Sequence, residues 1–164
     1  MIRLFLLSCF VCFGISFVQA QSIKLPQDCK RILVKRFQSW RIAKIESSII
    51  DYFKRDRSFE QPDLIRGDWN GDGKTDYAVL LENEKDPNKK ITIALIKSRS
   101  SYSAYILDGY DCIMSMKKGD KDYNFETRKT FRYKRDAIFT YHWEKGGDSF
   151  VFEKGKFRAI LTSD

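Results

Sequence analysis

The sequence predicts an α+β fold in which N-terminal helices pack on an antiparallel β-sheet arranged as a meander. Apolar residues at helical spacing are confined to the region between Asp28 and Arg55. From Asp63 onward, short apolar or β-branched runs alternate with turn residues. Consecutive strands that follow helices, rather than alternating with them, are typical of α+β proteins with antiparallel sheets.

Residues 1–20 have the pattern of a secretory signal peptide. Arg3 supplies the positive charge, residues 4–18 are apolar, and Val18-Gln19-Ala20 fits a cleavage site. The apolar run is short for a membrane span, so we expect cleavage and export to the periplasm or the medium, without a stable span afterwards. An uncleaved anchor is the alternative. Residues 21–164 then form one domain, long enough for a hydrophobic core.

Two helices are expected in the first third of the chain. Residues 28–37 follow Pro26 and place Cys29, Ile32, Leu33 and Phe37 on one face, with Asp28 as a possible N-cap. Residues 40–45 fit either a continuing helix or a short strand. A second helix is expected over residues 49–55, capped by the preceding serines and ending before Pro62.

The remaining chain is expected to be β-structure. The predicted strands are residues 64–67, 77–82, 91–96, 102–107, 112–114, 137–143, 148–152 and 157–161. Residues 117–129 are interpreted as a charged connection.

One polar loop, residues 68–76, has the spacing of a calcium site. Asp68, Asn70 and Asp72 offer side-chain oxygens, Lys74 offers its backbone carbonyl, and Asp76 would bind directly or through a water. Gly73 stands where the chain must bend sharply. An ordinary Asp/Asn/Gly turn is the alternative, but clustered carboxylates repel one another unless a cation neutralises them.

The residues after this loop indicate which kind of calcium motif it is. An EF-hand would continue into a helix with an acid at loop position 12, where this chain has Val79 inside the apolar run 77–81. The segment from Ile65 to Leu81 therefore resembles the FG-GAP/VCBS type of calcium loop, found in integrin-α-like propellers and in secreted bacterial proteins. The resemblance implies a loop that joins two antiparallel strands pinned by Ca²⁺. A propeller needs several repeats, and the motif occurs once.

Cys29 and Cys112 remain after the predicted cleavage, because Cys9 and Cys12 lie in the signal peptide. An even pair in an oxidising compartment predicts a disulfide between Cys29 and Cys112. Two buried thiols are the alternative. A zinc site would need more ligands than these cysteines and His142, the single histidine.

No catalytic motif stands out in the sequence. His142 alternates with Tyr141 and Trp143 along a predicted strand, no Gly-x-Ser-x-Gly elbow is present, and the glycines at 146 and 147 fit a hairpin turn. We therefore expect a non-enzymatic protein with a structural calcium ion. A small secreted hydrolase or a hydrolase inhibitor stays open, since paired carboxylates are brought together only by the fold.

The formal net charge of +8 is compatible with an anionic partner. We expect a protein, peptide or anionic glycan at the cell surface rather than nucleic acid, which an exported protein rarely meets. Basic residues of the predicted helical region could form one patch: Lys30, Arg31, Lys35, Arg36, Arg41 and Lys44. Aromatic residues of the strands could stack on sugars or fill a sheet face: Tyr102, Tyr105, Tyr110, Tyr133, Tyr141 and Trp143.

Overall fold

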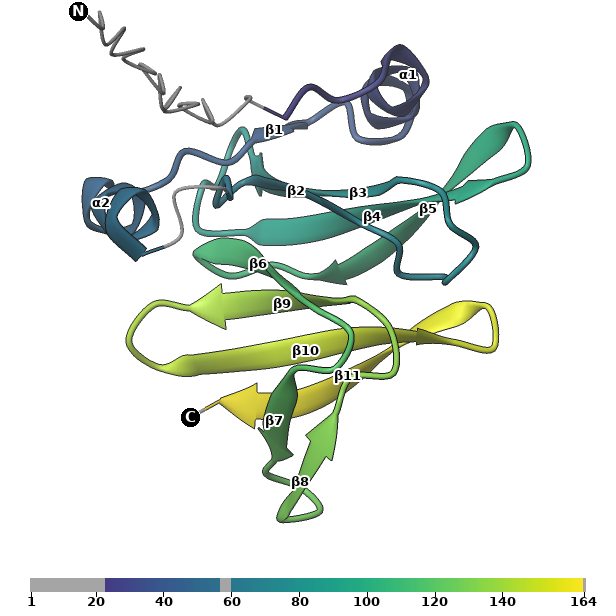
Figure 1. The fold of residues 1–164 in the computed structure, drawn as a ribbon. Coiled ribbons are helices and arrows are strands. Elements are labelled where there is room, and N and C mark those ends of the chain that lie inside the picture. Colours follow the sequence, from purple (N-terminus) through teal and green to yellow (C-terminus); the bar gives the residue numbers. More distant parts are fainter. Residues whose placement is uncertain (1–22, 57–59, 164) are drawn as a thin grey trace, which may run out of the picture.

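The computed structural model describes residues 23–56 and 60–163. Within these ranges the chain forms two short helices and antiparallel β-sheets, as expected for a fold dominated by strands (Figure 1). The predicted signal peptide, residues 1–20, lies outside the described residues. None of the helices in the described part is long and apolar enough to cross a membrane.

The strands form two main sheets and a separate hairpin. The first sheet contains β1 (Trp40–Ile42), β2 (Leu64–Gly67), β3 (Asp76–Asn83), β4 (Lys90–Ser98) and β5 (Ser101–Asp108), in the order β1-β3-β4-β5 with β2 also paired to β3. The second contains β6 (Cys112–Met116), β9 (Ala137–His142), β10 (Gly146–Glu153) and β11 (Lys156–Ser163), in the order β11-β10-β9-β6. The hairpin pairs β7 (Lys121–Asn124) with β8 (Lys129–Arg132).

The predicted single meander is wrong, because the two main sheets stack on each other (Figure 1). The cause is visible in β3, where every residue from Ala78 to Glu82 is buried. A strand that is apolar on both faces needs a covering layer on each side. The chain therefore leaves the first sheet after β5, and β6 pairs with β9.

Successive residues of β3 enter different hydrophobic clusters. Ala78 and Leu80 face the core between the sheets, together with Ile113, Ile138 and Phe150. Val79 and Leu81 belong to a second cluster, which contains Cys29 and Phe37 and against which Ile32 and Leu33 pack. The second cluster lies beneath α1 (Gln27–Arg36), so this helix covers the outer face of the first sheet.

The helices occur close to the predicted positions. α1 spans Gln27–Arg36, but Asp28 is not its N-cap: that position is Pro26, and Asp28 lies in the first turn, 3.1 Å from Arg31. α2 spans Ser47–Asp56 and buries Ile49 and Phe53. The ambiguous segment 40–45 contains the strand β1.

Two neighbouring strands, β1 and β2, share one edge of β3. β1 pairs with its C-terminal half and β2 with its N-terminal half. Between them the chain makes an excursion that contains α2. Its two ends meet at Leu80, whose carbonyl accepts from the Ala43 amide at 3.0 Å and whose amide donates to the Asp63 carbonyl at 2.9 Å.

The predicted disulfide is also wrong. Cys29 and Cys112 are both buried thiols, and each belongs to a different hydrophobic cluster. Cys29 packs beneath α1, whereas Cys112 packs with Phe139 and with Ile49 and Phe53 of α2. Burial raises the pKa of the Cys29 thiol to about 11.

Candidate functional site

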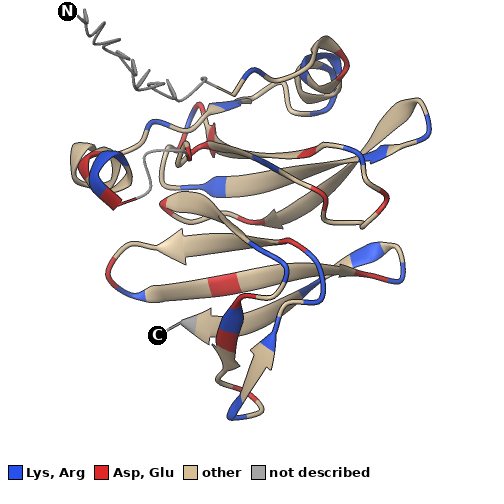
Figure 2. Cartoon of the chain, in the orientation of Figure 1, with Lys and Arg blue, Asp and Glu red and all other residues tan. Residues whose placement is uncertain are grey.

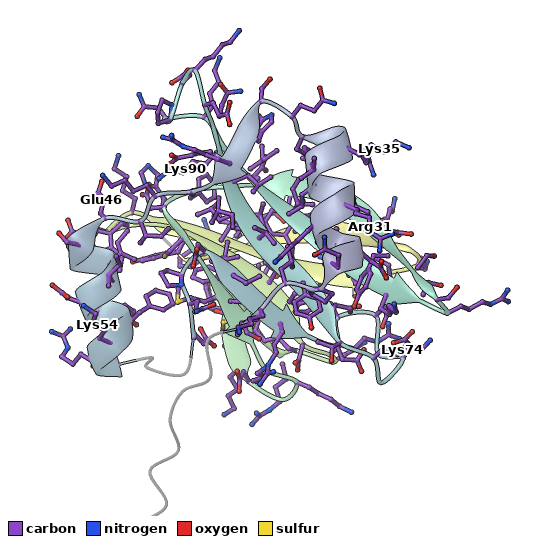
Figure 3. The ribbon with its side chains drawn as sticks, turned by 90° about the horizontal axis from the view of Figure 1, so that it is seen from above. Arg31, Lys35, Glu46, Lys54, Lys74 and Lys90 are labelled. Carbon is purple, nitrogen blue, oxygen red and sulfur yellow. The ribbon has the colours of Figure 1, made fainter. Side chains whose placement is uncertain are left out.

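The predicted calcium loop connects β2 to β3 at one end of the first sheet. In Figure 3 its Lys74 lies on the side of the molecule opposite Lys54 of α2. Gly71 and Gly73 adopt φ values of 74° and 79°, a region that favours glycine. Space is open around Gly73, so its backbone conformation is the reason for a glycine there.

The first oxygens of the loop converge on one amide. The Asp72 N–H donates to Asp68 Oδ1 and to Asn70 Oδ1, both at 3.0 Å, and the Gly73 N–H donates to Asp68 Oδ2 at 2.9 Å. These bonds bring Asp68, Asn70 and Asp72 into one tight turn, which fits both the calcium loop and the ordinary turn that the sequence allows.

Asp72 itself faces a cation of the chain. Its Oδ1 accepts from the Lys74 amide at 3.0 Å, and its Oδ2 lies 3.3 Å from the Lys74 ammonium. Burial raises the pKa of Asp72, but the bonds and charge of Lys74 together outweigh it, so the pKa lies below its usual value. The Lys74 ammonium thus occupies a position where positive charge is favourable.

Asp76 has a different environment from the other loop acids. It is completely buried, and its oxygens accept from the backbone amides of Trp69 at 2.9 Å and Lys97 at 2.7 Å. Its pKa is raised to about 6, mainly by burial and to a smaller degree by the charge of Asp68, although the backbone amides oppose both effects. Asp76 therefore fastens the beginning of the loop to the end of β4.

The donor set of the loop fits calcium chemically. Carboxylate, amide and carbonyl oxygens are the ligands that Ca²⁺ prefers, and a carboxylate that accepts two N–H bonds retains lone pairs for a cation. Among the described residues, however, no group of three or more His, Cys, Asp or Glu side chains is arranged to hold a metal ion. Asp68, Asp72 and Asp76 are close together in the sequence, but the oxygens of Asp76 accept hydrogen bonds from backbone amides.

Two further residues shape the loop, and sequence reasoning missed both. Trp69 is completely buried in the core between the sheets, and a Cβ on Gly67 would lie 2.7 Å from its indole nitrogen. Arg135 donates to the Asn70 carbonyl at 2.7 Å. A tryptophan within a polar loop is a visible signal of an anchor, whereas nothing local marks Arg135.

A second polar cluster surrounds His142, which the sequence analysis treated as an ordinary strand residue. Asp111 Oδ2 lies 2.8 Å from His142 Nδ1 and accepts from the Trp143 amide at 3.0 Å, while Asp111 Oδ1 lies 3.2 Å from Lys90 Nζ. The ring of Tyr110 stacks on the imidazole. Burial raises the pKa of Asp111, but these partners outweigh it, and the pKa is lowered.

All six cations proposed as a basic patch are exposed, and two of them have acidic partners, whereas two of the aromatics proposed as a sheet face are occupied in packing. Arg31 pairs with Asp28, and Arg41 lies 2.8 Å from Glu82. Among the aromatics, Tyr133 is buried, and Tyr105 packs edge-on against Phe152 and Phe157.

No protein-family model matches this chain, and no curated protein or solved structure matches it either.

Proposed function

We propose that the protein is an exported, non-enzymatic binding protein in which the loop 68–76 binds one structural Ca²⁺. Asp68, Asn70, Asp72 and the Lys74 carbonyl would hold the ion, with Asp76 contributing directly or through a water. The partner would be a protein, peptide or anionic glycan at the cell surface. The resemblance of residues 65–81 to FG-GAP/VCBS loops supports the same assignment.

The observation that carries the calcium proposal is the local charge of the loop. Asp68 and Asn70 turn their oxygens toward one amide. Asp76 is buried, and in the described part of the chain no lysine, arginine or histidine forms an ion pair with Asp68 or Asp76. Burial is the main cause of the raised pKa of Asp76, and the charge of Asp68 adds to it; a divalent cation would neutralise that charge.

Calcium should therefore stabilise the fold. Exported modules bind Ca²⁺ with a Kd on the order of 0.1–1 mM. At about ten times the Kd, binding adds roughly 1.4 kcal/mol, which raises the Tm of a protein of this size by about 3–6 °C. The measurement is a thermal melt with Ca²⁺ or with EGTA at matched ionic strength.

Two variants make this test specific. Asp72→Ala should abolish the calcium-dependent shift, because it removes a ligand. Asp86→Ala is the matched control, since this partly exposed carboxylate pairs with Lys89 on the β3–β4 turn, away from the loop, and it should keep the shift. Coincident melts of the unaltered protein with and without Ca²⁺ would contradict the proposal.

The alternative of a small hydrolase has one observation in its favour, the contact between Asp111 and His142 Nδ1. A carboxylate at Nδ1 orients an imidazole so that Nε2 can act as a general base. The non-enzymatic proposal fails if the protein has a hydrolytic activity that His142→Ala abolishes and that Asp72→Ala leaves intact.

A further inference from the structure

A cavity of about 720 Å³ opens between the β7–β8 hairpin and the strands β10 and β11. Its volume lies within the range of about 300–1,000 Å³ that is usual for ligand pockets. The β7–β8 hairpin, which forms one wall, lies in the part of the molecule farthest from α1, below the second sheet in Figure 1. The residues of the predicted calcium ligand set do not line the cavity.

The walls of the cavity are strongly basic, and blue segments gather around the hairpin and the adjoining loops in Figure 2. The lining contains the cations Lys129, Arg132, Lys134, Arg135, Lys154 and Arg158, and the acids Asp136 and Glu153.

Both lining acids already have partners. Asp136 Oδ2 lies 3.1 Å from Lys117 Nζ and its Oδ1 accepts from the Lys118 amide at 3.0 Å, while Glu153 lies 3.3 Å from Arg158. They therefore do not neutralise the remaining cations.

Three of the lining cations are available to a ligand. Arg132 and Arg135 donate to the carbonyls of Gly119 and Asn70, at 2.6 and 2.7 Å. Across residues 23–56 and 60–163, no carboxylate forms an ion pair with Lys129, Lys134 or Lys154. The cavity thus has uncompensated positive charge, which favours an anionic occupant.

The cavity also has an apolar floor and neutral polar groups. Val151 and Ile160 supply the floor, and Asn124, Thr127 and Thr130 supply amide and hydroxyl groups. The ring of Phe152 lies on the opposite face of β10, in the core between the sheets, where it packs edge-on against Tyr105 and Phe157.

The hairpin wall is held in place by buried hydrogen bonds. The Tyr133 hydroxyl bonds to Asp122 of β7 and lies 2.5 Å from Ser149 Oγ, which lies 3.0 Å from the Thr162 hydroxyl. Tyr133 lines the cavity and is almost fully buried. This network fastens the hairpin to β10 and β11, so the cavity is built into the fold.

We propose that this cavity binds a short segment of an anionic glycan that carries carboxylate or sulfate groups. Such a ligand presents anionic groups for the lysines, hydroxyls for the threonines and asparagine, and the apolar C–H faces of its rings for the floor. A lone phosphate would leave that floor uncovered. The inference rests on the proposed role as a binding protein and does not depend on calcium.

Isothermal titration calorimetry of the purified protein tests the inference. The probes are a heparin hexasaccharide, a hexamer of galacturonate, neutral maltohexaose, inorganic phosphate and vesicles of phosphatidylglycerol. We expect both anionic hexasaccharides to bind, with an affinity that falls as salt rises, and maltohexaose and phosphate to show no binding.

Two charge-matched double variants separate the cavity from the overall positive charge. K129A/K134A should weaken binding of the anionic hexasaccharides about tenfold. K30A/K35A removes the same charge from α1, where Lys35 is exposed (Figure 3), and should change the affinity less than about twofold. All four lysines are exposed, so unchanged melting temperatures confirm that the variants fold.

Equal weakening in the two double variants would overturn the site in favour of long-range attraction. If maltohexaose bound as tightly as the anionic hexasaccharides, the proposal that the ligand must be anionic would be wrong. If the vesicles bound tightly and the glycans did not, the proposal that the ligand is a glycan would be wrong. The titrations are repeated in EGTA. Glycan binding that fails in both conditions overturns this inference and leaves the calcium-dependent shift in Tm intact.

Discussion

Thr92 is a buried residue of β4 whose hydroxyl makes no hydrogen bond within the described residues. A desolvated hydroxyl without a partner opposes folding. Its branched shape nevertheless fits a strand at the centre of the first sheet.

We therefore expect Thr92→Val to stabilise the protein by about 0.5–1 kcal/mol, because the shape is kept and the unsatisfied hydroxyl is removed. Thr162→Val is the matched control. Its hydroxyl lies 3.0 Å from Ser149 Oγ, so its loss should destabilise by a similar amount. Denaturant unfolding of both variants measures the difference, and a destabilised Thr92→Val would contradict the expectation.

At the same scale, the sequence predicts the local part of the candidate site and misses the rest. Asp68, Asn70 and Asp72 can be recognised because their spacing alone brings their oxygens into one turn. Arg135 could not be recognised, since it is 65 residues away from Asn70 in the chain. The contact of Asp111 with His142 likewise joins residues that only the pairing of β6 with β9 brings together.

Glu82 fastens the short strand β1 to β3. Its side chain is only 4% exposed, and its oxygens accept from Arg41 Nε at 2.8 Å and from the Lys44 amide at 2.9 Å. Burial raises the pKa of Glu82, but the Lys44 amide and the Arg41 guanidinium outweigh it, so the pKa lies below the ordinary 4.5. A lowered pKa in the folded state stabilises the protein above pH 4.5, and this stabilisation is lost as the pH falls further.

Glu82→Gln should therefore cost about 1–3 kcal/mol at neutral pH and should flatten the loss of stability below pH 4.5. The measurement is urea unfolding as a function of pH. Glu153→Gln serves as the control, because Glu153 and Arg158 are both about half exposed and such pairs add little. Parallel pH profiles for Glu82→Gln and the unaltered protein would contradict this role.

Most individual elements can be predicted from the sequence because their patterns are local. Each predicted strand lies in a strand of the structure with bounds shifted by no more than two residues. The β7–β8 hairpin was missed, since its residues are mostly charged and polar. Its position depends on the buried contact of Tyr133 with Asp122 and Ser149, which no local pattern contains.

The arrangement of the whole molecule could not be predicted from those elements. Buried residues on both faces of β3 require two covering layers, but the pattern does not specify whether helices or a second sheet supply them. The same uncertainty explains the incorrect disulfide, because pairing Cys29 with Cys112 assumes one common core. The structure places them in separate clusters.

The separation of the two thiols predicts a simple redox behaviour. A reductant should leave the Tm unchanged, and a thiol reagent should label Cys29 and Cys112 only after unfolding, because both are buried. Thermal melts with and without reductant, and mass spectrometry after labelling, check this. A mass lower by two hydrogens under non-reducing conditions would contradict it.

The meeting of Ala43 and Asp63 at Leu80 has a consequence for redesign. β1 and β2 together act as one interrupted strand beside β3. The segment that contains α2 leaves this strand and returns to it at the same residue of β3, Leu80. The length of the segment between Ala43 and Asp63 can therefore change without changing the pairing of β3. A variant that joins Ala43 directly to Asp63 would lose the packing of Ile49 and Phe53 against Cys112 and Phe139. The backbone pairing of β3 would be kept.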